Sequence, residues 1–306
     1  MDNISDICAN CGKGEESSDS LKVCTACKMV KYCSRECQIA HRPQHKKACK
    51  KRAAELYDEK LFKQPPPRED CPICMIRLPV LDTGRRYMSC CGKVICSGCN
   101  HAPVYDNEGN VVAGTCPFCR TPNPVTNEEV IKRVKKRAEA EDPHAIHMVG
   151  MFYSEGKYDF PQNYAKALEL WHRAGELEYA ASYFFIGFAY QYGKGVEVDE
   201  KKAKYYYELA AMEGDANARF VIGCKEANAG NYDRALNHFM IAAKGGGKLS
   251  NGVSDSLETM RKMVTNGHAT KDDYKKALES YQVYLDEIRS DQRDEAAAAD
   301  ENYKYY

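Results

Sequence analysis

Apolar and polar positions in the second half of the chain follow a pattern that recurs. Gly150, Gly187 and Gly223 stand 37 and 36 residues apart, and an alanine follows them 17, 16 and 12 residues later. Between these markers apolar residues recur three or four positions apart, as on one face of an α-helix. A period near 36 residues predicts pairs of helices stacked along the chain.

The second unit of this pattern is the clearest. Residues 183–190 predict a first helix, residues 192–196 a turn, Asp199 a helix cap, and residues 203–211 a second helix. The third unit has a shorter inner turn, and a fourth, diverged unit follows the glycine run 245–247. The pattern resembles the Sel-one-like repeat, a relative of the tetratricopeptide repeat. The resemblance implies an all-α helical-repeat solenoid over residues 142–289.

The aromatic residues of the repeats permit two interpretations. At helical spacing an aromatic stripe is more often core than ligand site, so we expect most of these rings to be buried. A stacked array also has a concave face on which partner peptides can lie. The stripe consists of Phe184, Phe185, Tyr190, Tyr205, Tyr206 and Tyr207.

The segments on either side of the repeats are polar. Residues 124–141 predict a basic linker helix that starts at the cap Thr126, and Asp142 with Pro143 predicts the start of the next helix. Residues 290–306 are acidic and have nothing apolar to bury before their last tyrosines, so we expect a frayed helix or a disordered tail.

The first 119 residues contain fifteen of the sixteen cysteines, in two arrays. The first array has eight potential ligands in four short-range pairs, which is the number that two tetrahedral zinc sites need. It resembles the MYND zinc finger over residues 8–49, within a domain of residues 1–52. The resemblance implies two structural zinc ions. One would be held by Cys8, Cys11, Cys33 and Cys37, and the other by Cys24, Cys27, His45 and Cys49.

His41 is an alternative to His45 as the fourth ligand of the zinc ion held by Cys24, Cys27 and Cys49. His41 follows Cys37 by one helical turn, whereas His45 precedes Cys49 at the spacing that puts two donors on one helix face. The spacing favours His45 and leaves His41 as the alternative.

The second array follows a helical and proline-rich linker at residues 53–68 and also has eight cysteines. It resembles an all-cysteine RING finger over residues 71–120, within a domain of residues 69–123. We call residues 69–123 the second cysteine module. The resemblance implies two more zinc ions, and therefore four in all. One would be held by Cys71, Cys74, Cys96 and Cys99, and the other by Cys90, Cys91, Cys116 and Cys119.

This array departs from the RING pattern at its third and fourth ligands, which are adjacent. Side chains of adjacent residues on an extended strand point apart, so Cys90 and Cys91 can share an ion only if the backbone turns there, as Gly92 permits. Lys93 has no lone pair to offer when it is protonated. His101 is the alternative ligand.

Composition and charge limit the other possibilities. Lys+Arg and Asp+Glu are equal at 44 each, so net charge does not favour nucleic acid as a partner. The first residues lack a basic start and an apolar run, and no apolar stretch is long enough for a membrane span. We therefore expect an intracellular protein, cytoplasmic or nuclear, with zinc sites rather than disulfides. Cys224, the remaining cysteine, is expected to be a small buried side chain.

Two functions fit these modules. The RING resemblance implies a ubiquitin-protein ligase, in which Ile73 and Pro117 contact a ubiquitin-conjugating enzyme and Arg120 orients the ubiquitin thioester. The MYND finger or the repeats would then hold the substrate. The alternative is a non-enzymatic scaffold that binds partner proteins or peptides. Neither function uses a catalytic side chain of the protein itself.

Overall fold

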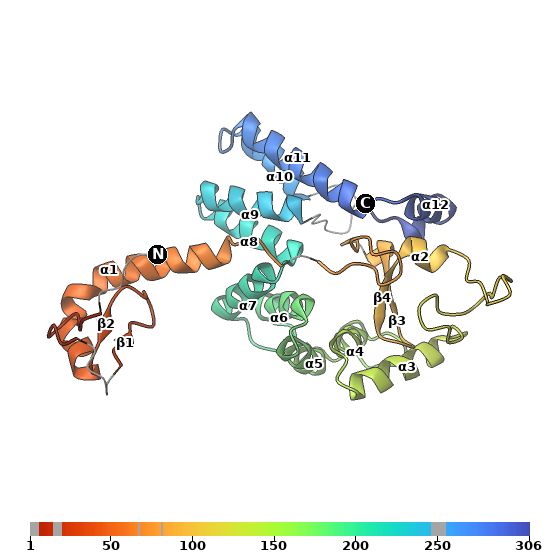
Figure 1. Ribbon diagram of the computed structural model, residues 1–306, viewed down its shortest axis with the longest axis horizontal. Coiled ribbons are helices and arrows are strands. Elements are labelled where there is room, and N and C mark those ends of the chain that lie inside the picture. Colours follow the sequence, from red (N-terminus) through yellow and green to blue (C-terminus); the bar gives the residue numbers. More distant parts are fainter. Residues whose placement is uncertain (1–5, 15–19, 67, 81, 246–254) are drawn as a thin grey trace. The chain divides into compact units, whose positions relative to one another are not determined.

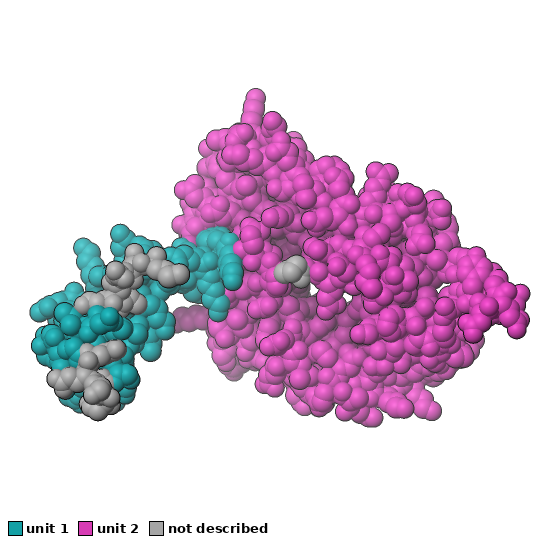
Figure 2. Space-filling view, in the orientation of Figure 1, with its two compact units in different colours: residues 1–63 teal, residues 64–306 magenta. Residues whose placement is uncertain are grey.

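The computed structural model describes residues 6–14, 20–66, 68–80, 82–245 and 255–306. Two compact units make up the chain, residues 1–63 and residues 64–306 (Figure 2). The second cysteine module and the helical repeats, which the sequence suggests as separate domains, lie together in the second unit.

The first unit is a small cysteine-rich fold followed by a long helix. Strands β1 (Lys22–Val23) and β2 (Lys31–Tyr32) pair antiparallel, and helix α1 covers Arg35–Leu61. The Ser34 hydroxyl caps this helix by accepting a hydrogen bond from the Cys37 amide at 3.3 Å. Because α1 continues to Leu61, the domain boundary that we expected at residue 52 falls inside the helix.

The second cysteine module is built on a short hairpin. Strands β3 (Arg85–Met88) and β4 (Lys93–Cys96) pair antiparallel, between a 3-10 turn at Asp82–Gly84 and helix α2 (Ser97–His101). Leu78, Met88 and Ile95 pack among its cysteines. The segment 104–112 contains an isolated antiparallel β-bridge between Tyr105 and Val111.

Helices α3 (Asn127–Glu139) and α4 (Pro143–Glu155) start where the sequence predicts. The Thr126 hydroxyl caps α3 by accepting from the Glu129 amide, and Asp142 caps α4, with proline in its first turn. The two helices pack together through a core that includes Val134 and Ile146, both fully buried. The basic helix is therefore packed onto the start of the repeats.

The repeats are consecutive antiparallel helix pairs (Figure 1). Residues 246–254, which include part of the glycine run, lie outside the described residues. The third pair has the shortest inner loop, as the sequence predicts. The pairs are α4 with α5 (Tyr164–Glu176), α6 (Ala180–Tyr192) with α7 (Glu200–Met212), α8 (Ala216–Asn228) with α9 (Tyr232–Lys244), and α10 (Asp255–Thr265) with α11 (Lys271–Ile288).

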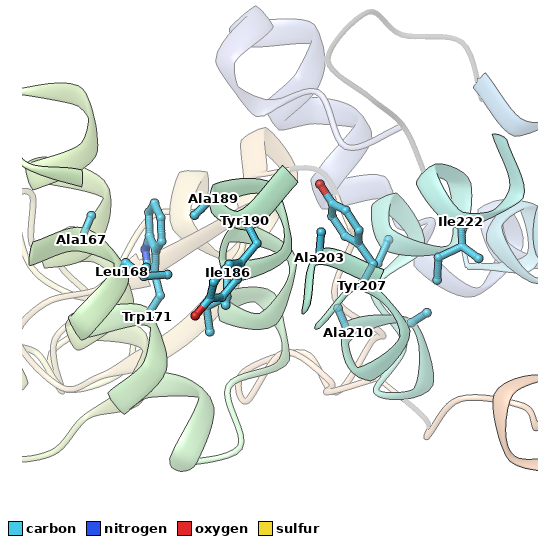
Figure 3. Close-up of a cluster of buried hydrophobic side chains, with 12 residues drawn as sticks. Ala167, Leu168, Trp171, Ile186, Ala189, Tyr190, Ala203, Tyr207, Ala210 and Ile222 are labelled. Carbon is cyan, nitrogen blue, oxygen red and sulfur yellow. The ribbon is translucent and has the colours of Figure 1, made fainter. Parts of the chain in front are cut away.

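The recurring glycines allow an aromatic ring of the second helix to touch the first helix. A Cβ atom at Gly187 would lie 2.9 Å from Cδ1 of Tyr207, closer than carbon atoms approach in packed cores. Tyr207 is 1% exposed and lies among the buried alanines of this core (Figure 3). The same pairing occurs between Gly150 and Trp171, and between Gly223 and Phe239.

The C-terminal segment is folded, in contrast to the frayed or disordered tail expected from its composition. Helix α12 covers Asp291–Ala299, and a 3-10 turn, η2, follows at Glu301–Tyr303. Helix α12 packs on α2 of the second cysteine module (Figure 1). Arg293 and Ala296 are completely buried and Tyr305 is 1% exposed, so contacts distant in sequence supply the packing that the local pattern lacks.

Across the part of the chain that the structure describes, every helix is too short or too polar to cross a membrane.

Candidate metal centres

Four of the five Cys-x-x-Cys pairs fold into similar tight turns, whereas Cys96 and Cys99 lie at the start of helix α2. In each turn the residue after the second cysteine has a positive φ, and its amide donates to the carbonyl of the first cysteine. A residue with positive φ reverses the chain so that both thiols point to the same side. The four residues with this conformation are Gly12, Lys28, Met75 and Arg120.

These turns and the ligands that follow them come together as four groups. Within each group the ligand atoms all lie within 4.8 Å of one another. The first unit contains Cys8, Cys11, Cys33 and Cys37 in one group, and Cys24, Cys27, His45 and Cys49 in the other. The second cysteine module contains Cys71, Cys74, Cys96 and Cys99, and Cys90, Cys91, Cys116 and Cys119.

Distances within the groups fit tetrahedral zinc. Four sulfur ligands at about 2.3 Å from one ion stand about 3.8 Å from each other. The Cys24 and Cys49 sulfurs are 3.8 Å apart, as are those of Cys74 and Cys96, and the Cys11 and Cys33 sulfurs are 3.6 Å apart. A disulfide would need about 2.05 Å, and all the cysteines are free thiols. The residues present therefore fit zinc.

The two candidate histidines of the first unit have different neighbours. His45 Nε2 lies 3.3 Å from the Cys27 sulfur, inside a ligand group. His41 lies one turn earlier on α1, and its Nδ1 is hydrogen-bonded to the Tyr32 hydroxyl at 3.1 Å. The rings of the two histidines stack with centroids 5.5 Å apart. The structure thus brings His45 to the cysteines and places His41 beside the group.

The adjacent cysteines of the second module lie in the turn between β3 and β4. The amides of Cys91 and Gly92 both donate to the Met88 carbonyl, at 3.2 and 2.8 Å, and Gly92 has a φ of +72°. This turn directs both thiols to the same group: the Cys90 sulfur lies 3.4 Å from Cys119, and the Cys91 sulfur 4.0 Å from Cys116.

The alternative ligand of this group lies elsewhere. The ring of His101 makes an edge contact with Tyr303 of the C-terminal segment, at 5.7 Å between centroids. The groups that the structure assembles in the second module consist of cysteines alone.

One thiol in each group has a lowered pKa. Burial by itself raises the pKa of Cys8, Cys24 and Cys119, but hydrogen bonds outweigh burial and bring each pKa to about 6. Hydrogen bonds with the Cys96 and Cys99 thiols hold the pKa of Cys71 well below its usual value. Another thiol in each group has a raised pKa, because it is buried or donates a hydrogen bond to its neighbours; these thiols are Cys33, Cys49, Cys99 and Cys90. One thiol of each group therefore favours the thiolate, which is the form that binds metal.

The three predicted contact residues for a conjugating enzyme lie on two of the turns. Ile73 is 39% exposed in the turn between Cys71 and Cys74. Pro117 is half-buried in the turn between Cys116 and Cys119, next to Phe118, which is 41% exposed. Arg120 follows that turn, and its guanidinium donates to the Tyr105 carbonyl at 2.8 Å.

Two arginines beside the second module have no counterpart in the sequence prediction. Arg137 of α3 donates to the carbonyls of Ser89 and Cys90, and Arg293 of α12 donates to the carbonyls of Ile76 and Arg77. Neither residue belongs to a motif of the cysteine arrays. Since each arginine is distant in sequence from the turn it contacts, no local signal indicates its role.

Most of the aromatic stripe is core. Phe184, Phe185, Tyr190, Tyr206 and Tyr207 belong to the core cluster or pack against it, as expected, while Tyr205 is 56% exposed. Cys224 is partly buried and packs against the core of the third and fourth helix pairs.

These features define a protein that joins zinc-finger-like cysteine modules to a helical-repeat solenoid. Residues 8–49 match the MYND finger family, and residues 143–179 and 180–215 match the Sel1 repeat family. The chain therefore contains a MYND finger and Sel1 repeats, modules that suggest a role in protein interaction.

Three relatives match parts of the chain. The sel1-like repeat-containing protein L21 of Acanthamoeba polyphaga mimivirus is 36% identical over 66 residues, 22% of this chain and 12% of that protein. The E3 ubiquitin-protein ligase DA2 of Arabidopsis thaliana is 22% identical over 208 residues, 66% of this chain and 49% of that protein. HRD3B, an ERAD-associated E3 ubiquitin-protein ligase component of Arabidopsis thaliana, is 31% identical over 99 residues, 31% of this chain and 15% of that protein. The chain thus spans less than half the length of each.

Among solved structures, a Sel1 repeat protein from Oxalobacter formigenes is similar at 26% identity with a TM-score of 0.43. The similarity covers 59% of this chain and 67% of that one.

Proposed function

We propose that this protein binds four zinc ions and acts as a RING-type ubiquitin-protein ligase. The second cysteine module would hold the ubiquitin-conjugating enzyme, and the MYND finger or the Sel1 repeats would hold the substrate. The observation that carries the proposal is the exposed apolar surface on the two turns of the second module. Zinc in the two ligand groups of this module would hold these turns rigid.

Exposed apolar side chains on both turns support this docking surface. Ile73 and Met75 are 39% and 71% exposed at the first turn, and Phe118 is 41% exposed at the second. Single exposed apolar side chains are common, but three of them on the two turns of one small module favour a protein partner. Complete burial of an isoleucine contributes about 1.5–3 kcal/mol, and the exposed part of Ile73, 39% of the residue, accounts for about two fifths of that.

Arg120 is suited to a different task. Its backbone has a φ of +64°, and its side chain is held by the Tyr105 carbonyl in the segment 104–112. A guanidinium held in this way keeps further N–H groups to donate, and it can fix the orientation of a bound ubiquitin thioester. Such orientation accelerates transfer without adding much affinity.

The names of two relatives agree with the proposal. DA2 is named as a ubiquitin-protein ligase, and HRD3B as a component of one. DA2 is 22% identical over 49% of its length and HRD3B is 31% identical over 15% of its length, so these names support the proposal less than the exposed turns do.

A non-enzymatic scaffold is the second candidate, and one observation favours it. Asn100 and His101 follow the ligand Cys99, at a position where an apolar residue would extend the docking surface. Both contact Tyr303 of the C-terminal segment, through a hydrogen bond of 3.4 Å and a ring contact. Because Asn100 and His101 are polar, the apolar surface that a conjugating enzyme could contact is smaller than it would be with an aromatic residue there.

Ubiquitin discharge from a panel of charged conjugating enzymes tests the proposal, with the full chain loaded with zinc. Ile73→Ala should weaken enzyme binding several-fold, whereas Arg120→Ala should slow discharge at saturating enzyme with little change in binding. Val125→Ala is the matched control, because Val125 is 91% exposed and lies outside both turns. If the zinc-loaded chain accelerates discharge from no enzyme of the panel, the scaffold replaces the ligase.

A further inference from the structure

The C-terminal segment, residues 289–306, makes direct contact with the ligand group Cys71, Cys74, Cys96 and Cys99. Helix α12 packs on α2, which contains Cys99 and follows Cys96 (Figure 1). Gly98 lies between these two ligands, and a Cβ atom there would lie 2.9 Å from the backbone nitrogen of Arg293. The backbone of α12 therefore touches the residues that hold the ligands.

Arg293 is the side chain that α12 inserts at this contact. It is completely buried, and its Nη1 donates to the carbonyls of Arg77 and Ile288 at 2.8 and 2.5 Å. Its Nη2 donates to the Ile76 carbonyl at 3.2 Å and lies 4.0 Å from the Cys74 sulfur. The guanidinium thus contacts the backbone after the first ligand turn and one ligand itself.

The charge of Arg293 has no carboxylate partner within 4.0 Å among the described side chains. A buried cation without a partner of opposite charge is strongly destabilising. A zinc ion with four thiolates has a formal net charge of about −2, which such a site must also balance. Cys74 is one of those thiolates, so the buried cation and the buried anion offset each other.

We propose that Arg293 is a positioning residue of this zinc site, and that the C-terminal segment is therefore part of the second cysteine module. Arg293 orients the turn after Cys74 through the Ile76 and Arg77 carbonyls and offsets the negative charge of the thiolates. The proposal rests on zinc at this group, but it does not depend on ligase activity.

Arg137 makes the proposal specific to one site. It donates to the carbonyls of Ser89 and Cys90 beside the other ligand group of the module, at 3.1 and 2.8 Å. Unlike Arg293, it is partly exposed and lies 3.5 Å from a carboxylate oxygen of Asp142. The charge of Arg137 is therefore balanced by the Asp142 carboxylate. Of the two arginines, only Arg293 has its charge balanced by the ligand thiolates themselves.

The experiment measures which cysteines lose zinc, in the full-length protein. Zinc-loaded wild type, Arg293→Met, Arg293→Lys and Arg289→Met are challenged with a zinc chelator and N-ethylmaleimide, and alkylated cysteines are identified by mass spectrometry over time. Arg289 is the matched control, since its side chain is 73% exposed in the same segment. Methionine keeps most of the apolar stem of arginine and removes the charge.

We expect Arg293→Met to release zinc from Cys71, Cys74, Cys96 and Cys99 about 10–100 times faster, the range for loss of a residue that supports a metal ligand. Arg293→Lys should fall between Arg293→Met and wild type because it keeps the charge but not the planar fork. Alkylation of Cys90, Cys91, Cys116 and Cys119 should change much less, and Arg289→Met should behave as wild type. Equal acceleration at both groups, or none at either, would overturn the proposal.

A second measurement separates charge from simple loss of structure. In cobalt-substituted protein, a nearby cation stabilises the electron-rich thiolates and raises the energy of their charge-transfer band. Arg293→Met should shift part of this band to longer wavelength while helix content by circular dichroism stays that of wild type. An unshifted band in a variant with native helix content would contradict the charge-balancing role. Wild type in which Cys71, Cys74, Cys96 and Cys99 are alkylated without chelator would overturn zinc at this site.

Discussion

At the scale of single residues, the ligand groups depend on backbone conformation as much as on cysteine. Cys24 and Cys27 are close in sequence, but their thiols converge because Lys28 adopts a φ of +56°. A non-glycine residue in this region is strained by roughly 1 kcal/mol, which metal binding can offset. The spacing of the cysteines therefore predicts the pairs, while the conformation of the next residue explains how each pair closes.

The choice between His41 and His45 gives a prediction about zinc content. His45→Ala should lose one zinc ion per chain, because it removes a donor from the group of Cys24, Cys27 and Cys49. His41→Ala removes a hydrogen bond to the Tyr32 hydroxyl and a ring contact with His45 but no ligand, so it should keep four ions. Native mass spectrometry of the two variants measures the difference, and zinc loss from His41→Ala alone would reverse the assignment.

His147 of α4 gives a prediction about pH. Burial is the main cause that lowers its pKa from 6.5 to about 3, with a smaller contribution from His144, and its Nδ1 is hydrogen-bonded to the Ser182 hydroxyl at 2.9 Å. Because the folded pKa is depressed, the unfolded chain binds the extra proton first as the pH falls. The stability of the repeats is therefore complete above pH 6.5 and falls by about 1.4 kcal/mol per pH unit below it.

Comparison of wild type with His147→Gln measures this effect. Glutamine can keep a hydrogen bond to Ser182 but does not titrate. The difference in melting temperature between the two proteins should change between pH 7 and pH 5.5, in the direction that disfavours wild type at low pH. A difference that is constant over this range would rule out a buried neutral His147.

At the scale of secondary-structure elements, the repeats are predictable because their packing is local. In the first three pairs a glycine of the first helix meets a ring of the second helix, and both lie within about one period of the pattern. Helix α12 is not predictable in this way. Its alanine run has no amphipathic pattern, and Ala296 is buried only because α12 packs on α2, whose residues lie far earlier in the chain.

Gly187→Ala tests the packing of glycine against a ring. Alanine in an exposed helix would add up to about 1 kcal/mol of stability. Here the new Cβ atom would lie 2.9 Å from Tyr207, so we expect a net loss of about 1–3 kcal/mol. The same substitution combined with Tyr207→Leu should cost much less, since the ring is gone. Thermal melting of wild type, Gly187→Ala, Tyr207→Leu and the double variant measures this coupling.

At the scale of the whole molecule, the chain consists of two units that do not follow the boundary between zinc fingers and repeats. The MYND finger and α1 form one unit, whereas the second cysteine module belongs with the repeats. The Val80 amide of the module donates to the Tyr284 hydroxyl of α11 at 3.2 Å, and Tyr281, Ile288 and Tyr305 share a core cluster with Val80. The sequence predicts the modules but not this association, because no local pattern encodes it.

Two matched substitutions test the division of the chain into these two units. Cys24→Ser should release zinc from the MYND finger and leave the melting of the Sel1 repeats unchanged, because the finger lies in a separate unit. Cys71→Ser should lower the melting temperature of the repeats, by about 2–4 °C for each kcal/mol of support that is lost. Circular dichroism at 222 nm follows both melts. Equal melting of the repeats in both variants would mean that the second module stabilises its own fold only.

The contact between Arg293 and Cys74 also has a consequence for the time course of synthesis. The two residues are 219 positions apart in the chain. At about 5–20 residues per second, a ribosome produces Arg293 roughly 10–45 s after Cys74. The ligand group that is complete once Cys99 has emerged must therefore wait for the last helix, and during that interval its thiolates are exposed to competing metals and oxidants without their buried cation.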